Sequence, residues 1–310
     1  MDANLPRSSP AARIANALTI DVEDYFQVSA FDAVVPRDSW ASHESRVCRN
    51  TERLLQIFGD AGVRGTFFVL GWVAERFPHL VRQIAAAGHE IGSHSYGHRL
   101  VYDLTPQAFR EDVRRAAAAI SGAAGVQVLG YRAPSFSVTE RSLWALDILI
   151  EEGYVYDASI FPVRHDRYGI PGSPRQFHQI TRGGRTLWEC PSSTVRVGGV
   201  NLPTGGGGYF RLLPYTWTGW GISQINREGR PAMFYLHPWE VDPDQPRIDA
   251  PALARLRHYG NLHKTEGRLK RLLAEFAWAP LAEVLALEPA IAPGANWSIR
   301  PAPTELQPLL

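Results

Sequence analysis

Short apolar runs alternate with longer stretches of helical spacing along most of the chain. The runs are rich in β-branched and aromatic residues, as is typical of buried strands. We predict strands at Ala17–Val22, Gly65–Leu70, Glu90–Ser93, Val128–Tyr131, Tyr154–Tyr156 and Ala232–Leu236. We predict helices between them at Ser45–Ala61, Pro78–Ala87, Thr105–Ile120, Thr139–Glu152 and Pro214–Arg227. The alternation predicts an α/β fold, in which parallel strands joined by helical crossovers form a barrel or a doubly wound sheet.

The alternation is interrupted between residues 163 and 210. The glycines of RGGR and TGGGGYF lie in this segment, which predicts hairpins and loops inserted on the α/β core. Together with the rings of Tyr168, Tyr209 and Phe210, the glycines suit two interpretations: a loop that contacts a sugar ligand, or a structural cover. Residues 286–310 are rich in Pro and Ala, and we expect them to form a tail beyond the folded domain.

Composition narrows the possible partners. The chain has 310 residues, of which 45% are hydrophobic, so it can bury a large core. Its 32 basic and 31 acidic residues leave no surplus charge for a nucleic-acid backbone, and we expect no nucleic-acid partner. No apolar run approaches the roughly 20 residues of a membrane helix, and MDANLPRSSPAA lacks the pattern of a signal peptide. We therefore expect no transmembrane segment and a cytoplasmic protein.

Three of the ten histidines lie in HEIGSHSYGHR, residues 89–99. His94 and His98 are four residues apart at a predicted strand-to-helix turn, where this spacing lets both imidazoles reach one point, as in metal sites. Such a pair also arises by chance on helix surfaces, and a divalent metal needs a further carboxylate or nitrogen ligand. The pair is a candidate part of a metal site, whereas His89 is interpreted as structural.

Asp21, Glu23 and Asp24 follow the first predicted strand, in the segment TIDVEDYF. Three carboxylates this close repel one another unless a cation compensates them or one of them is protonated. A solvated acidic turn is the alternative, but Tyr25 and Phe26 come directly afterwards and are expected to be buried. The acidic cluster is therefore the second candidate part of a metal site.

Five segments occur in a characteristic order: TIDVED, SHSYGH, YRAPSFS, YDASIFP and FYLHPWE. This order resembles the motifs of the polysaccharide deacetylase family (NodB homology, carbohydrate esterase family 4). DVEDYFQVSAF, FPVRHDRYGIP and GGGYFR further resemble the subfamily associated with exosortase and PEP-CTERM loci. The resemblance covers residues 14–285, with a C-terminal subfamily extension from about residue 165. It implies a distorted (β/α) barrel with about seven strands, a divalent metal that is usually zinc, and removal of N-acetyl groups from amino sugars.

In that family an aspartate and two histidines hold the metal, and the resemblance assigns two of these places to His94 and His98. The acids here are spread as D-V-E-D instead of the common adjacent pair of aspartates. Counting from the strand makes Asp21 the general base and leaves Glu23 or Asp24 as the third ligand. Counting from the adjacent pair makes Glu23 the base and Asp24 the ligand. We choose Asp21 as the base and Asp24 as the ligand, and we keep Glu23 as a catalytic candidate whose role is unresolved.

The resemblance implies further roles for polar groups. Arg132 would pair with the base carboxylate, and the backbone amide of Ser135 would stabilise the oxyanion. His237 would protonate the leaving amine, and Asp157 would pair with His237 and raise its pKa. Taken singly, His237 suits a core histidine and Asp157 a turn residue.

Substrate contacts are expected from apolar and aromatic side chains. Leu236, Trp239 and Tyr156 would form a wall for the acetyl methyl group, although such residues are more often plain core. Tyr209 would contact a sugar ring.

The sequence thus predicts a metal-dependent deacetylase for N-acetylated amino sugars in an exopolysaccharide or its oligosaccharide precursor. One alternative is an amidohydrolase of a small cyclic amide or ureide, similar to allantoinase. Another is a non-catalytic sugar-binding relative, which the filled acid, histidine and arginine positions disfavour. A long open cleft would favour the polymer, and a closed pocket would favour the cyclic amide.

Overall fold

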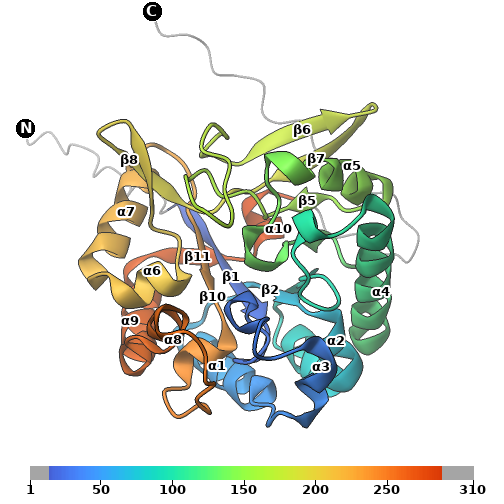
Figure 1. The fold of residues 1–310 in the computed structure, drawn as a ribbon. Coiled ribbons are helices and arrows are strands. Elements are labelled where there is room, and N and C mark those ends of the chain that lie inside the picture. Colours follow the sequence, from blue (N-terminus) through green and yellow to red (C-terminus); the bar gives the residue numbers. More distant parts are fainter. Residues whose placement is uncertain (1–13, 288–310) are drawn as a thin grey trace, which may run out of the picture.

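Along the central sheet, seven consecutive strands run parallel to one another (Figure 1). The structure is a computed structural model that describes residues 14–287. The strand order is β10 (Met233–Leu236), β1 (Ala15–Val22), β2 (Thr66–Val69), β3 (Glu90–Ser93), β4 (Gly130–Tyr131), β5 (Tyr156–Asp157) and β7 (Arg185–Glu189). β6 (His178–Arg182) lies antiparallel to β7, and β11 (Ala277–Ala279) pairs with β1. The predicted α/β fold, a distorted (β/α) barrel with about seven strands, is confirmed.

Helices pack around the outside of this sheet. They are α1 (Val47–Ala61), α2 (Gly71–Arg76), α3 (Pro78–Ala86), α4 (Pro106–Ala124), α5 (Trp144–Glu151), α6 (Gly207–Leu212), α7 (Tyr215–Arg227), α8 (Ala252–Tyr259), α9 (Leu262–Glu275) and α10 (Leu281–Val284). The sequence sets the ends of α4 clearly. The Thr105 side chain accepts a hydrogen bond from the Ala108 amide, Pro106 is the first helical residue, and Gly125 ends the helix with a left-handed φ of 69°.

The predicted elements correspond to β1 to β4, β10, α1, α3, α4 and α7. The strand predicted at Tyr154–Tyr156 overlaps β5 only at Tyr156. The predicted helix at Thr139–Glu152 is shorter, since only Trp144–Glu151 is α-helical. The interrupted segment does hold two hairpins, formed by β6 with β7 and by β8 (Thr194–Val197) with β9 (Val200–Pro203). The sequence did not predict that β7 would also extend the parallel sheet.

The seam between β7 and β10 is bridged by an irregular segment. The Met233 amide donates to Ser193 Oγ at 2.7 Å, and the Tyr235 amide donates to the Gly205 carbonyl at 2.7 Å. Gly206 forms an isolated bridge with Tyr235 at a φ of 125°, and a Cβ there would lie 2.0 Å from the Tyr235 carbonyl oxygen. Only glycine fits this backbone and this approach. This part of the glycine cluster is therefore structural.

The two faces of β1 have different surroundings. Leu18, Ile20 and Val22 pack into the hydrophobic core between the sheet and the outer helices. Thr19 and Asp21 alternate with them, as strand geometry requires, and lie inside the barrel, where both accept hydrogen bonds from Arg132. The period of the strand thus turns Asp21 toward the barrel interior.

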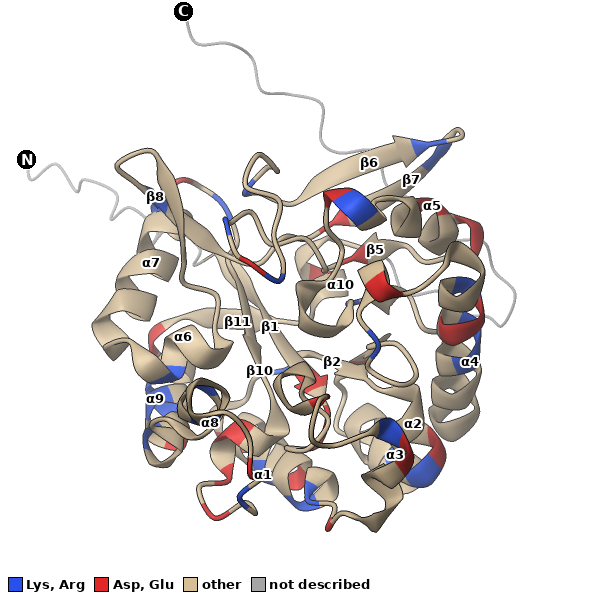
Figure 2. Ribbon diagram, in the orientation of Figure 1, with Lys and Arg blue, Asp and Glu red and all other residues tan. Residues whose placement is uncertain are grey.

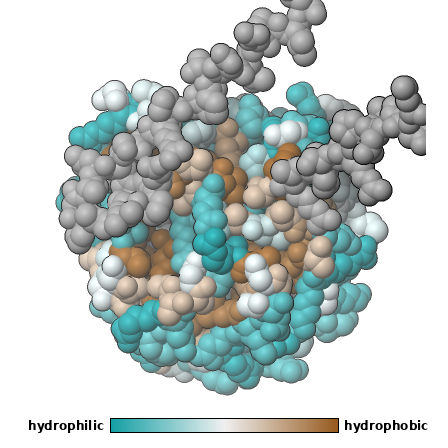
Figure 3. Space-filling model, turned by 180° about the vertical axis from the view of Figure 1, so that it is seen from behind, coloured by the Kyte–Doolittle hydropathy of each residue, from teal (hydrophilic) through white to brown (hydrophobic). Residues whose placement is uncertain are grey.

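The outer surface is mixed in character. Seen from behind, hydrophilic residues cover most of the lower part of the described surface, and apolar residues form separate patches across the middle (Figure 3). No helix within residues 14–287 has the length and apolar character needed to cross a membrane. Apart from residues 286 and 287, the predicted Pro/Ala-rich tail lies outside the described residues.

Candidate metal centre and active site

The candidate site residues lie at one end of the barrel, where the carboxyl ends of the parallel strands meet. Asp21 and Glu23 come from the end of β1, His94 and His98 from the loop after β3, and His237 follows β10. All five line one cleft of about 220 Å³. This is the edge at which α/β barrels carry their functional groups.

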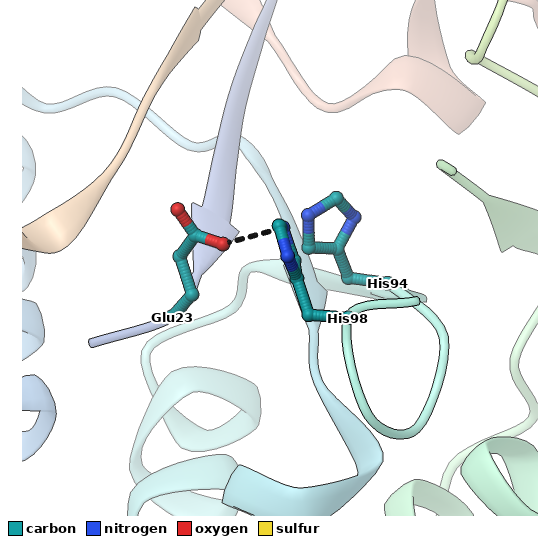
Figure 4. Close-up of side chains that lie close together, drawn as sticks. All are labelled: Glu23, His94 and His98. Carbon is teal, nitrogen blue, oxygen red and sulfur yellow. Dashed lines mark ion pairs between the residues drawn. The ribbon is translucent and has the colours of Figure 1, made fainter. Parts of the chain in front are cut away.

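Glu23, His94 and His98 form a buried group of potential metal ligands (Figure 4). One donor atom from each lies within 4.8 Å of the others. His94 Nδ1 is 2.8 Å from the Arg132 carbonyl oxygen, which fixes this ring and leaves Nε2 for a metal. Glu23 Oε2 lies 2.8 Å from His98 Nε2, and the buried Nδ1 of His98 has no hydrogen-bond partner among the described residues. Two imidazoles and a buried carboxylate fit a divalent cation such as zinc.

The protonation of this group also suits metal binding. Burial lowers the pKa of His94 to about 4, despite the opposing charge of Asp21, so the ring is neutral at neutral pH. Burial raises the pKa of Glu23, but the charge and contact of His98, with the charges of His237 and His94, outweigh burial and hold that pKa well below its usual range. A neutral imidazole and an ionised carboxylate are the forms that ligate metals.

Asp24, chosen from the sequence as the third ligand, lies elsewhere. Its Oδ2 accepts hydrogen bonds from Ser45 Oγ at 2.6 Å and from the amides of Arg46 at 2.9 Å and Val47 at 3.2 Å. The carboxylate therefore caps the start of α1 and is absent from the ligand group. The assignment is corrected from Asp24 to Glu23, because the backbone turns after β1 and directs these two neighbouring side chains to different places.

Asp21 and Arg132 form the ion pair that the resemblance implied. Arg132 Nη1 lies 2.7 Å from Asp21 Oδ1 and 2.8 Å from Thr19 Oγ1, and both charged side chains are buried. Asp21 Oδ2 lies 3.8 Å from His237 Nε2. Asp21 is thus held by one oxygen beside the metal-ligand group, in a position suited to a general base.

The partner of His237 is Glu240 and not Asp157. His237 Nδ1 lies 2.7 Å from Glu240 Oε1, and Glu240 in turn pairs with the buried Arg211. Burial lowers the pKa of His237, but the hydrogen bond to Glu240 and the charges of Glu23, Glu240 and Asp21 outweigh it and raise that pKa to about 9. The ring is therefore charged at neutral pH, as a proton donor requires.

Asp157 lies inside the sheet, away from the cleft. It is in register with Glu189 of the neighbouring strand, and its Oδ1 accepts a hydrogen bond from the Ser159 hydroxyl. Burial raises the pKa of Asp157 to about 6 and that of Glu189 well above its usual range. The expected pairing of Asp157 with His237 is corrected, since β5 directs the side chain toward β7.

The expected substrate wall is only partly present. Trp239 lines the cleft, and its indole N–H donates to Glu23 Oε1 at 3.1 Å. Leu236 is fully buried in the core behind the sheet, because the alternation of β10 directs Tyr235 toward the cleft instead. Tyr156 is also fully buried, with its hydroxyl donating to Glu90 Oε1 at 2.7 Å. Leu236 and Tyr156 are therefore corrected to core residues.

Three further sequence expectations concern Ser135, Tyr209 and His89. Ser135 lines the cleft with a left-handed φ of 51°, and its backbone amide donates to no described residue. Tyr209 lies in an adjoining cavity, where its hydroxyl is 3.0 Å from that of Tyr168. His89 is structural as expected, since its Nδ1 accepts from the Gly65 amide at 3.1 Å.

Glu240, Arg211 and Tyr235 are site residues that the sequence reasoning missed. Glu240 stands three positions after His237 in HPWE, a spacing at which one turn of helix brings two side chains together. That local signal was available in the sequence. Arg211 comes from α6, far away in the chain, and no local pattern connects it with Glu240.

Two family models match the chain. Residues 38–149 match the model described as polysaccharide deacetylase, and residues 158–286 match a domain of unknown function, DUF3473. Residues 38–149 of this chain are therefore similar to polysaccharide deacetylases. It is 32% identical over 98 residues to a peptidoglycan-N-acetylglucosamine deacetylase of Bacillus cereus, and 30% identical over 108 residues to a peptidoglycan deacetylase of Helicobacter pylori. These alignments cover 31% and 35% of this chain and 36% of each relative.

Solved structures share the fold over most of the chain. A crystal structure described as a putative polysaccharide deacetylase from Mycobacterium smegmatis matches with a TM-score of 0.62 at 20% identity, covering 90% of this chain and 91% of that one. Puue allantoinase matches with a TM-score of 0.59 at 14% identity, covering 91% and 93%. At these identities the likeness establishes the barrel fold and leaves the substrate open.

Proposed function

We propose that the protein is a metal-dependent N-deacetylase of amino sugars. The observation that carries this proposal is the placement of Glu23, His94 and His98 in one cleft with the Asp21–Arg132 pair and His237. Glu23, His94 and His98 would hold the metal, for which we propose zinc. When bound, the metal would supply an activated water and polarise the acetyl carbonyl.

The residues of the chain divide the remaining work among them. Asp21 would accept the proton of the attacking water, with Arg132 holding the carboxylate in place. The free backbone amide of Ser135 would donate to the oxygen that gains negative charge. His237, kept charged by Glu240, would protonate the nitrogen as the amide bond breaks. Trp239 would hold Glu23 in place through its indole N–H.

We further propose that the substrate is an exopolysaccharide or its oligosaccharide precursor. All three segments that resemble the exosortase-associated subfamily contribute residues to the cleft, among them Ser29, Tyr168 and Gly208. The cleft also continues into an adjoining cavity of about 410 Å³. An extended site of this kind suits a sugar chain better than a small cyclic amide, which favours the polymer over the allantoinase-like alternative.

Acetate and free-amine release tests this proposal directly. The purified protein is loaded with zinc and incubated with N-acetylglucosamine oligomers of increasing length and, separately, with allantoin. We expect acetate release that rises with chain length, no reaction with allantoin, and loss of both metal and activity in Glu23→Gln. Hydrolysis of allantoin without deacetylation of any oligomer would favour the cyclic-amide alternative.

A further inference from the structure

A second cavity opens directly beside the catalytic cleft, and we call it the side cavity. Its volume is about 410 Å³, within the range of sites that hold small molecules. It shares six lining residues with the cleft: Ser29, Ser135, Tyr168, Gly208, Tyr235 and Arg257. A substrate whose acetyl group reaches the candidate metal ligands can therefore extend into the side cavity without a break.

The side cavity is lined by two arginines and by no acidic residue. The Arg257 guanidinium makes no ion pair or hydrogen bond with any residue of the described range 14–287, although it also lines the cleft. Arg167 donates to Ser29 Oγ at 3.0 Å and contacts the hydroxyl of Tyr102, and both partners are neutral. Arg257 lies on α8, and Arg167 lies on the loop between β5 and β6; Figure 2 shows how basic and acidic segments are distributed over the ribbon. Two positive charges without a carboxylate partner favour a bound anion.

This arrangement differs from that of other arginines near the site. Arg211 is fully buried and neutralised by Glu240. Arg255, on the same helix as Arg257, lies 3.6 Å from Asp249 and lines neither cavity.

The positive charges of Arg257 and Arg167 also act on His165 in the side cavity. Burial lowers the pKa of His165, and the charges of Arg257 and Arg167 lower it further against the opposing charge of Asp166.

Aromatic rings form a firm wall in the same cavity. Tyr168 lies between His165, with ring centroids 3.8 Å apart at 10°, and Phe161, at 5.6 Å and 9°. Its hydroxyl is 3.0 Å from that of Tyr209, which joins the loop to α6. Hydroxyl groups and ring faces beside charged donors are what a polar, anionic sugar derivative requires.

We propose that the side cavity binds an anionic group of the substrate, a carboxylate or a phosphate, attached next to the N-acetylated sugar. Arg257 and Arg167 supply the recognition, and the substrate class is therefore an acidic oligosaccharide or a phosphate-linked amino sugar. This inference rests on the proposed deacetylase function and specifies its substrate. Neutral chains of N-acetylglucosamine are poorer substrates than charged ones.

The test compares charged probes with neutral counterparts. A hyaluronan tetrasaccharide, which alternates glucuronate with N-acetylglucosamine, is paired with chitotetraose. UDP-N-acetylglucosamine is paired with the methyl glycoside of N-acetylglucosamine. We expect kcat/KM for at least one charged probe to exceed that of its neutral partner by about 5- to 10-fold at low salt, and this ratio to fall as salt is added. A preference for the hyaluronan tetrasaccharide identifies a carboxylate, and a preference for UDP-N-acetylglucosamine identifies a phosphate.

Arginine variants connect the preference with the side cavity. Arg257→Gln and Arg167→Gln should each reduce kcat/KM for the preferred charged probe several-fold more than for its neutral partner. Arg255→Gln is the matched control, and it should leave the ratio unchanged. Equal rates for charged and neutral probes in the unaltered protein, or an unchanged ratio in Arg257→Gln, would overturn the proposal.

Measurements of binding distinguish a failure of this inference from a failure of the proposed function. The dissociation constants of the same probes are measured by calorimetry with metal-free protein, which needs no turnover. If a charged probe binds more tightly than its neutral partner and this difference is lost in Arg257→Gln, the side-cavity proposal is supported even where no acetate is released. The missing acetate release would then count only against the proposed deacetylase function. Equal binding of charged and neutral probes counts against the side cavity whatever the activity.

Discussion

Glu240 Oε1 lies 2.7 Å from Nδ1 of His237, which fixes the imidazole so that Nε2 faces Asp21 and Glu23. One turn of backbone after β10 is enough to build this pair, whereas the sequence motifs assigned the partner role to Asp157. Glu240 also neutralises Arg211. The Glu240 carboxylate therefore connects the imidazole of His237 with a buried cation.

Glu240→Gln should lower kcat by about 10- to 100-fold, because His237 loses the carboxylate that orients its ring and raises its pKa. Asp157→Asn should cost much less, since its side chain lies against Glu189 and outside the cleft. Thermal unfolding of both variants is measured first, because the substitution of Glu240 would leave Arg211 without its charge partner. A larger loss of kcat in folded Asp157→Asn than in folded Glu240→Gln would restore the original assignment.

Glu23→Gln should release the metal, whereas Asp24→Asn should keep it. In Asp24→Asn the free energy of unfolding should fall by about 1–2 kcal/mol. The neutral side-chain amide that replaces the carboxylate accepts hydrogen bonds from the first backbone amides of α1 less strongly. Elemental analysis after dialysis and urea unfolding measure the two effects. Full metal content in Glu23→Gln together with loss from Asp24→Asn would contradict the ligand set.

Asp21→Asn should retain metal and lower the rate of deacetylation by about 10²- to 10⁴-fold, because an amide cannot accept the proton of water. Metal content and acetate release from an N-acetylglucosamine oligomer are measured on one preparation. Wild-type turnover in this variant would exclude Asp21 from the mechanism and give the role of base to another group.

The Asp157–Glu189 pair should make the protein less stable as pH rises. Burial holds the folded pKa of Asp157 at about 6 and that of Glu189 higher still, above the values of roughly 4 expected when unfolded. The folded state therefore binds more protons, and its extra stability, complete below about pH 4, is lost as pH increases through 6 and beyond. Urea unfolding of metal-free protein at pH 5.5, 7 and 8.5 measures this slope. Glu189→Gln should flatten it by about 1–3 kcal/mol over that range, and an unchanged slope would assign the pH dependence to other groups.

Gly206→Ala should destabilise the barrel far more than Gly208→Ala. A Cβ at residue 206 would lie 2.0 Å from the Tyr235 carbonyl oxygen, whereas nothing lies within 4 Å of one at residue 208. The left-handed backbone of Gly206 adds strain of about 1–3 kcal/mol. Comparison of the two melting temperatures measures the difference, and equal temperatures would show that the seam tolerates a side chain.

The sequence predicted the parts of the site that depend on strand ends and motif order. His94, His98, Asp21 and Arg132 meet as expected, because adjacent parallel strands deliver them to one edge. The prediction from the sequence failed where the backbone turns within one or two residues of the end of a strand. Glu23 and Asp24 are neighbours, and only the turn after Val22 decides which one faces the histidines. β7 was missed because RTLWE is short and half polar, and its place in the sheet depends on a contact with distant β5.

The seam at Gly206 bears on how this chain could have diversified. The segment matched as polysaccharide deacetylase contains β2, β3 and β4, and the segment matched as DUF3473 contains β7 and β10. β1 precedes both matched segments, and β5 lies between them. The two matched segments therefore contribute strands to one and the same sheet. Exchange of residues 158–286 for those of a distant relative would replace the whole seam and most residues that line the side cavity, Arg167 and Arg257 among them. The new segment would have to pair with β1 on one side and with β5 on the other.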